Sequence, residues 1–204
     1  VKMVEAAGRK AAAIKCDVSE PQAVTVMANE VRKQFGHPDI VINCCGIFPQ
    51  KNFTEMTYDD WRKVLATNLD SAFLVSSAFA PGMIERRAGK IINISSQTGV
   101  VALEDHAAYA SSKAALNMLT KSMTVEWARY NIQANAICPT VIMTPMGVQV
   151  WSAPEKRDPM LAKIPAGRFG EAVEIADCAL YLASPASDLI NGAVIMMEGG
   201  YTSL

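Results

Sequence analysis

The sequence has few cysteines and lacks the patterns that mark disulfide-rich, metal-binding or nucleic-acid-binding proteins. The five cysteines are odd in number, lie inside apolar runs and form no C-x-x-C pair, which predicts reduced core thiols and no metal site. The 19 Lys and Arg residues nearly balance the 20 Asp and Glu residues, and neither sign forms a long run. We therefore expect no nucleic-acid partner. The cysteines are Cys16, Cys44, Cys45, Cys138 and Cys178.

A long uninterrupted apolar segment is also missing. Residues 131–153 carry no charge, but Asn, Gln, Pro and Gly interrupt them too often for a membrane-spanning helix. This stretch predicts a buried strand followed by a loop. No basic segment precedes an apolar one near Val1, so we expect no secretory signal, no membrane partner and a cytoplasmic location.

The length and the 50% hydrophobic content predict a single α/β domain over residues 1–204. Short apolar runs bounded by Gly, Pro, Asp or Ser predict strands buried on both faces, at 11–16, 39–44, 90–94, 132–138 and 193–197. Amphipathic patterns predict helices at 1–7, at 21–35 with Ser19 as N-cap, at 58–83 with Thr57 as N-cap, at 107–130 and at 171–183.

The alternation of strands and helices predicts a parallel sheet with helices on both faces. In such sheets, ligands bind outside the carboxyl ends of the strands. We therefore expect the functional site just after Asn43, Ile94 and Cys138.

A serine, a tyrosine and a lysine are the candidate catalytic residues. Ser96 follows the predicted strand 90–94, and Tyr109 and Lys113 lie four residues apart on the next predicted helix. Residues four apart share a helix face, so the Lys113 ammonium can lower the pKa of Tyr109 and make it an acid/base at neutral pH. A Y-x-x-x-K spacing also occurs on ordinary exposed helix faces. Ser96 adds weight because it can donate a hydrogen bond to the same substrate oxygen.

Other polar positions fit a ligand site as well. Asn68 lies inside a long predicted helix, where Asn is a poor helix former and often has a buried role. Asp17 follows the predicted strand 11–16 and can cap the next turn or accept a hydrogen bond from an adenine amine. Gly46, in the turn that begins at Asn43, allows the backbone to approach a flat ligand closely.

These residues together resemble the short-chain dehydrogenase/reductase family. The resemblance rests on Ser96, Tyr109, Lys113 and Asn68, on the turn from Asn43 to Gly46 (N-C-C-G against the usual N-N-A-G), and on the segments Cys16-Asp17-Val18, Asn135-Ala136-Ile137-Cys138-Pro139 and Glu198-Gly199-Gly200-Tyr201. The stretches 92–97 and 139–144, with His106, Met146-Gly147 and Trp151, resemble the L-xylulose (dicarbonyl) reductases and related polyol dehydrogenases most closely.

The resemblance implies an enzyme that uses NADP or NAD, with roles for particular residues. Ser96 and Tyr109 would bind the substrate oxygen, Lys113 would hold the ribose hydroxyls, and Asn68 would organise a water that relays protons. The cofactor-binding residues implied are Asp17, Asn43, Gly46, Tyr109, Lys113, Pro139, Ile142 and Thr144.

The substrate pocket is predicted from polar and aromatic residues near the catalytic ones, namely Ser96, Gln97, Leu103, His106 and Trp151. Gln97 and His106 offer polar groups to sugar hydroxyls, and Trp151 can cover an apolar face. Two of these residues have plain structural alternatives: His106 as the cap of the helix that begins near residue 107, and Trp151 as packing for its loop.

The sequence departs from the family pattern in one respect. The glycine-rich turn that carries the cofactor pyrophosphate is absent from these residues, together with the strand and helix around it. The implied fold is therefore a Rossmann-like doubly wound parallel sheet flanked by helices that lacks the first βαβ unit.

Three functions remain open at this point. The first is interconversion of a ketose or dicarbonyl and its polyol. The second is reduction of another carbonyl class, such as 3-oxoacyl thioesters or steroid-like ketones, because fold and catalytic residues do not fix the substrate. The third is a non-catalytic oligomer partner. Helices 58–83 and 107–130 carry apolar residues on more than one face, which together with the resemblance predicts a homotetramer, with a dimer as the alternative.

Overall fold

The computed structural model describes residues 1–203, with residue 146 described by its backbone alone. Four parallel strands form one sheet in the order β1-β2-β3-β4. Their bounds are Ile40–Asn43, Gly89–Ile94, Ile132–Pro139 and Val194–Met197. The predicted α/β parallel sheet with helices on both faces is confirmed.

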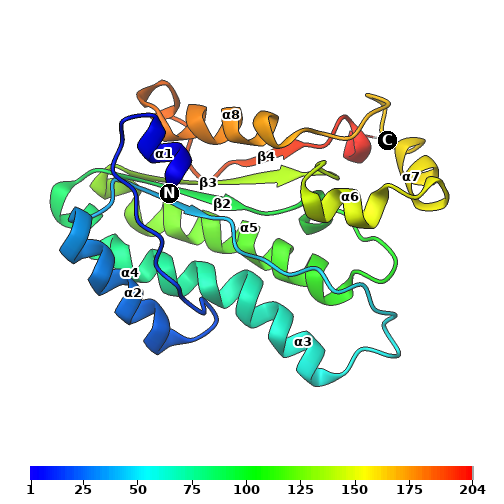
Figure 1. Ribbon diagram of the computed structural model, residues 1–204, viewed down its shortest axis with the longest axis horizontal. Coiled ribbons are helices and arrows are strands. Elements are labelled where there is room, and N and C mark those ends of the chain that lie inside the picture. Colours follow the sequence, from blue (N-terminus) through cyan, green and yellow to red (C-terminus); the bar gives the residue numbers. More distant parts are fainter. Residues whose placement is uncertain (204) are drawn as a thin grey trace.

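The helices form a layer on each face of the sheet (Figure 1). On one face α2, α4 and α5 pack against β1, β2 and β3, and on the other face α8 packs against β2 and β3. The helix bounds are α1 Lys2–Ala6, α2 Pro21–Phe35, α3 Tyr58–Leu65, α4 Ser71–Arg86, α5 Ala107–Trp127, α6 Pro145–Trp151, α7 Pro154–Leu161 and α8 Ala172–Ala183.

Two apolar cores hold these layers together. Ile91 faces α2, α4 and α5 and belongs to the larger core, whereas its neighbour Ile92 faces α8 and belongs to the smaller one. This division follows from the alternation of side chains along a strand. β3 is buried along its whole length because both helical layers cover it.

The predicted strand at residues 11–16 is wrong. These residues run without pairing between α1 and α2, and a strand needs a hydrogen-bonded neighbour that none of the described strands supplies. Burial on both faces is also wrong for β1, where Ile40 and Ile42 are exposed. The reason is that α8 covers β2 and β3 but does not extend over β1.

The predicted helix 58–83 is interrupted rather than continuous. Thr57 caps α3 in a reciprocal capping box with Asp60, as predicted. A π-helical turn over Ala66–Asp70 then separates α3 from α4. Ser19 is not the cap of α2: its hydroxyl and backbone N–H both donate to Asp17, and Pro21 begins the helix.

The cysteines are only partly in the core. Cys138 is buried in β3, but Cys44 and Cys45 are exposed because they follow the end of β1 in an unpaired loop. Cys16 and Cys178 are half-buried, and all five thiols are free. Across residues 1–203 no helix is long and apolar enough to cross a membrane, and no cluster of metal-ligating side chains is found.

A buried chain of polar side chains links the sheet to two helices. The Asn43 amide donates to Ser76 of α4 and to the Asn93 side-chain oxygen of β2, and the Asn93 amide donates to Thr120 of α5. Asn93 is fully buried, so each of its hydrogen bonds is made away from water. Removing this side chain leaves partners unsatisfied in the interior, which costs more than an exposed hydrogen bond.

We expect Asn93→Ala to lower the free energy of unfolding by about 2–4 kcal/mol, because two hydrogen bonds are lost and their partners stay buried. Urea denaturation monitored by circular dichroism measures the change. Gln34→Ala, which removes an exposed amide on α2, is the control and should change stability by less than about 0.5 kcal/mol. Equal effects of the two substitutions would contradict the role given to Asn93.

Candidate active site

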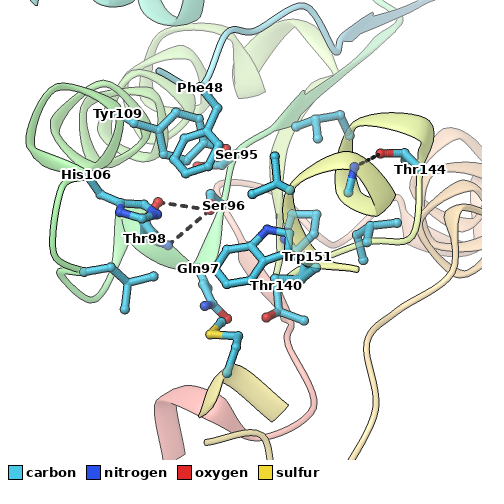
Figure 2. A pocket seen from close by; sticks show the side chains of 18 residues that line it. Phe48, Ser95, Ser96, Gln97, Thr98, His106, Tyr109, Thr140, Thr144 and Trp151 are labelled. Carbon is cyan, nitrogen blue, oxygen red and sulfur yellow. Dashed lines mark hydrogen bonds between the residues drawn. The ribbon is translucent and has the colours of Figure 1, made fainter. Parts of the chain in front are cut away.

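A cavity of about 230 Å³ opens at the carboxyl ends of β2 and β3 (Figure 2). This is the edge of the sheet at which a ligand was expected. The cavity brings together side chains from the β2 end, the start of α5 and the segment from β3 into α6. The predicted site residues that line it are Ser96, Gln97, Leu103, His106, Tyr109, Pro139, Ile142, Thr144 and Trp151.

Ser96 is held at the end of β2 by a short 3₁₀ turn over Gln97–Gly99. Its Oγ accepts hydrogen bonds from the Thr98 backbone N–H (3.2 Å) and from the Thr98 hydroxyl (3.0 Å). Because both contacts use the oxygen as acceptor, the Ser96 hydrogen remains available for donation. Ser96 can therefore donate to an oxygen placed in the cavity.

Tyr109 lies in the first turn of α5 and packs edge-on against Phe48, with ring centroids 4.7 Å apart. Burial raises the pKa of Tyr109, and the nearby Ser96 hydroxyl acts in the opposite direction. Lys113 was predicted to lower this pKa, and that prediction is wrong. The net shift is upward because desolvation of the phenol has the largest effect. The phenol is protonated at neutral pH and is a proton donor rather than a phenolate.

Lys113 lies one helical turn beyond Tyr109 and is only 4% exposed. Its Nζ donates to the Ile94 carbonyl oxygen at 2.8 Å and lies 5.6 Å from the centroid of the Tyr109 ring. Burial lowers the pKa of Lys113 to about 8. The predicted neighbourhood of Tyr109 and Lys113 is thus present, although Lys113 lies behind the tyrosine and outside the cavity lining.

Asn68 lies in the π-helical turn and is almost completely buried. Its Oδ1 accepts from the Ile47 backbone N–H, and its Nδ2 donates to the Ile47 carbonyl and to Ser112. Single π turns occur often at functional sites. Here the turn directs the amide of Asn68 toward the loop after β1 and toward α5.

Gly46 lies against both of these buried residues. A Cβ atom at this position would be 3.4 Å from Asn68 Oδ1 and 3.7 Å from Lys113 Nζ. A longer side chain would occupy the space beside the lysine. The role of the Gly46 turn in a ligand site stays a prediction.

His106 packs against Phe48, with ring centroids 4.7 Å apart, and its Nδ1 is hydrogen-bonded to the Glu104 carbonyl. Because a carbonyl only accepts, Nδ1 carries the hydrogen and Nε2 is an acceptor. Burial lowers the pKa of His106, so the ring is neutral at neutral pH. The alternative of His106 as the cap of α5 is confirmed in position, since His106 is the N-cap residue, although its side chain makes no capping hydrogen bond.

The wall formed by the segment after β3 is mostly apolar. Pro139 and Ile142 line the cavity, and Thr144 caps α6 by accepting from the Gly147 backbone N–H at 3.2 Å. Trp151, at the end of α6, lines the cavity and also packs against Phe169. The packing interpretation of Trp151 is therefore confirmed, whereas its contact with a substrate stays a prediction.

Four predicted cofactor residues do not line the cavity: Lys113 and Gly46, described above, and Asn43 and Asp17. Asn43 uses its amide in the buried polar chain described above. Asp17 is exposed and accepts both hydrogen bonds from Ser19, so it caps a turn, which is the first of its two expected roles. Its contact with an adenine stays a prediction.

Sequence reasoning missed Thr140 and Phe48 as cavity residues. Thr140 immediately follows the predicted strand end, so its position gave a usable signal. Phe48 follows the Gly46 turn by two residues, but a loop aromatic carries no spacing signal that would place it against α5.

The residues at this edge fit the nicotinamide end of a dinucleotide. Apolar Pro139 and Ile142 line the same cavity as the polar groups of Ser96 and Tyr109. Such a cavity, apolar with a few placed polar groups, is typical of sites for small ligands and cofactors.

Known proteins resemble this chain over most of its length. The family model described as enoyl-(acyl carrier protein) reductase matches residues 1–202. The NAD-dependent glycerol dehydrogenase of Listeria innocua is 38% identical over 93% of this chain and 74% of that protein. The gluconate 5-dehydrogenase of Gluconobacter oxydans is 35% identical over 97% of this chain and 77% of that protein.

Among solved structures, a gluconate 5-dehydrogenase from Burkholderia cenocepacia, in complex with NADP and tartrate, superimposes with a TM-score of 0.88. It is 38% identical, and the match covers 92% of this chain and 74% of that one. The likeness therefore extends from sequence to fold.

The buried lysine generates a prediction about stability. The pKa of Lys113 falls from its ordinary value of 10.5 to about 8 on folding, so between these pH values the unfolded state binds more protons and stability rises with pH. Relative to Lys113→Met, the wild type should gain about 3 kcal/mol of unfolding free energy from pH 7 to pH 10.5. Urea denaturation of both proteins across this range measures the gain.

Lys121→Met is the matched control, since Lys121 is an exposed lysine on the same helix. Its difference from wild type should stay nearly constant with pH. A constant difference for Lys113→Met as well would show that the Lys113 ammonium is not desolvated.

Proposed function

The chain belongs to the short-chain dehydrogenase/reductase family and is an NAD(P)-dependent oxidoreductase; we propose that it interconverts the carbonyl of a ketose or dicarbonyl and the alcohol of the corresponding polyol. The observation that carries this proposal is the cavity in which Ser96 and Tyr109 lie beside the wall of Pro139 and Ile142. A single substrate in this cavity can contact Tyr109, the proposed proton donor, and also Pro139 and Ile142, which are predicted to lie beside the cofactor. The polyol dehydrogenase among the relatives supports this substrate class.

Tyr109 is the proposed acid/base. When bound, the nicotinamide supplies a hydride to the carbonyl carbon in reduction and accepts it from the alcohol carbon in oxidation. In reduction, Ser96 donates a hydrogen bond to the carbonyl oxygen, and Tyr109 transfers its phenolic proton to that oxygen as negative charge develops. In oxidation, the tyrosine oxygen receives the same proton from the alcohol.

Lys113 and Asn68 are proposed to act from behind Tyr109. Lys113 lies 5.6 Å from the centre of the phenol ring, and its positive charge is proposed to offset part of the desolvation that disfavours the phenolate left by proton donation. With ribose hydroxyls nearby, its remaining N–H groups would hold them. Asn68 fixes the loop at Ile47 beside Gly46, which keeps the space next to the lysine open for the cofactor or for a relaying water.

Gln97, His106 and Trp151 are proposed to hold the rest of the substrate. All three line the cavity around Ser96 (Figure 2). The neutral His106 offers Nε2 as an acceptor, and Trp151 covers an apolar face. A panel of ketoses, dicarbonyls and 3-oxoacyl thioesters, assayed with NADH and NADPH, separates this proposal from an acyl thioester reductase.

We expect Tyr109→Phe to lower turnover by at least about 100-fold, because only the proton donor is deleted. Dinucleotide affinity should change by less than about twofold, as the ring is retained. Steady-state kinetics and fluorescence titration measure the two quantities. Tyr130→Phe, which removes a hydroxyl at the opposite end of the α5 region, is the control and should keep full activity. Turnover of Tyr109→Phe within tenfold of wild type would reject Tyr109 as the acid/base.

A homotetramer is the proposed assembly. Leu116 and Met123 of α5 are buried in the cores, whereas Met118 and Val125 of the same helix are exposed, so apolar residues occupy two faces. Phe73 of α4 is exposed as well. Exposed apolar faces on long helices are typical of subunit interfaces.

We expect light scattering at micromolar concentration to give four times the chain mass, with a dimer as the smaller alternative. Met118→Glu combined with Val125→Glu should shift the mass toward smaller species, because charge is placed on the apolar face. A monomeric mass for the unmodified protein would contradict the proposal.

A further inference from the structure

We propose that the cavity selects a neutral polyhydroxy substrate over a sugar acid of the same length, and that the Thr140 hydroxyl is a substrate contact that acts together with Gln97. The inference rests on the proposed function and narrows its substrate class. The relatives do not settle this choice, since one is named for glycerol and another for gluconate. The cavity lining decides it.

The lining carries no side chain that could neutralise a carboxylate. Among the described residues, the eighteen that line the cavity include no Lys, Arg, Asp or Glu. Its one titratable imidazole, His106, has its pKa lowered by burial and is neutral. A carboxylate moved from water into this cavity would lose hydration without gaining an ionic partner, which is strongly unfavourable.

Two cations near the cavity, Lys113 and Arg168, are directed elsewhere. Lys113 is directed to the Ile94 carbonyl and lies behind the Tyr109 ring rather than in the lining. Arg168 faces a neighbouring pocket and pairs with both carboxylate oxygens of Glu174, at 2.6 and 2.9 Å. Reaching a substrate carboxylate would require Arg168 to leave this pair.

Two buried polar atoms in the lining lack partners. These are the Gln97 Oε1 and the Thr140 Oγ1, which make no hydrogen bond although each atom is shielded from solvent. Gln97 is only 2% exposed, so bulk water does not supply the missing partner of its oxygen. Buried polar groups in proteins are nearly always hydrogen-bonded, so an unpaired pair in one cavity points to a ligand that completes them.

Gln97 and Thr140 lie just beyond the ends of two neighbouring strands. β2 and β3 are adjacent and parallel, with Ile94 opposite Ile137 as the last pair of the register. Gln97 and Thr140 each follow three residues after that pair. Both side chains therefore come from equivalent positions beyond neighbouring strand ends, and Figure 2 shows them away from the Phe48 and Tyr109 rings.

A polyol hydroxyl satisfies both atoms. It can donate its hydrogen to the Gln97 Oε1 and accept from the Thr140 hydroxyl, or donate to either oxygen. A carboxylate has no hydrogen to donate to the glutamine oxygen. The same two atoms that bind a neutral hydroxyl therefore disfavour a sugar acid whose carboxylate is placed there.

The test compares length-matched pairs on the full chain, with galactitol against gluconate as the six-carbon pair and threitol against threonate as the four-carbon pair. In the pair that the enzyme turns over faster, we expect kcat/KM for the neutral polyol to exceed kcat/KM for the acid by at least tenfold. Saturation-transfer NMR of the same ligands measures binding independently of turnover and should show the same preference.

Thr140→Val tests the new contact, because valine keeps the shape and removes the hydroxyl. We expect KM for the preferred polyol to rise roughly threefold to tenfold, the range of one neutral hydrogen bond, with kcat and dinucleotide affinity nearly unchanged. Thr202→Val, at a position outside the cavity lining, is the matched control and should leave KM unchanged.

The outcomes separate the two proposals. Turnover that favours gluconate over galactitol and threonate over threitol would overturn the selection while leaving the dehydrogenase function in place. An unchanged KM in Thr140→Val would overturn the contact. Polyol binding in preference to the acid, with no turnover of any carbonyl or alcohol, would support the selection and overturn the proposed function instead.

Discussion

The candidate site depends on the burial of one ammonium group. Lys113 donates to the last carbonyl of β2, at Ile94, and this contact ties α5 to the end of the central strand pair. Since Tyr109 lies one helical turn earlier, the same contact fixes the phenol beside the β2 end, where Ser96 leaves the sheet. Burying a charge in this way is unfavourable for stability. In return, Tyr109 and Lys113 are held next to each other at the ligand-binding edge of the sheet.

The surrounding polar groups serve the same arrangement. Asn68, in the interruption between α3 and α4, holds the Ile47 backbone and contacts Ser112 on α5. Farther down the strands, Asn43 and Asn93 connect β1 and β2 to α4 and α5. The apolar cores position the layers, and these buried hydrogen bonds set the rotation and height of the helices that carry the site. The cavity itself keeps two unsatisfied oxygens for its ligand.

Much of the fold could be predicted from the sequence because its signals are local. The runs that became β1, β2, β3 and β4 are short, apolar and sharply bounded, and the Thr57 cap has a reciprocal partner three residues later. The strand expected at residues 11–16 failed because pairing is not a local property. The predictions of a continuous helix over 58–83 and of buried Cys44 and Cys45 failed for a similar reason. The π turn at Asn68 and the exposure of the two cysteines both depend on what packs around the loop after β1.

The site was predictable in membership but not in energetics. The i, i+4 spacing placed Tyr109 and Lys113 together, yet it carried no information about burial, which reverses the expected direction of the Tyr109 pKa shift. Asn43 occupied the expected strand end, but its amide was taken up by Ser76 and Asn93. Side-chain direction at a strand end depends on the neighbouring strand, and a single sequence does not contain that geometry.

Titration of Lys113 measures whether its ammonium is desolvated in the folded protein. In protein with ¹³C-labelled lysine side chains, the Lys113 signal is identified by its loss in Lys113→Met, and its chemical shift is followed as pH rises. We expect a midpoint near pH 8, because burial beside Tyr109 disfavours the ammonium. A midpoint at the ordinary lysine value near 10.5 would contradict it, since the ammonium would then be solvated and could not organise the site as described.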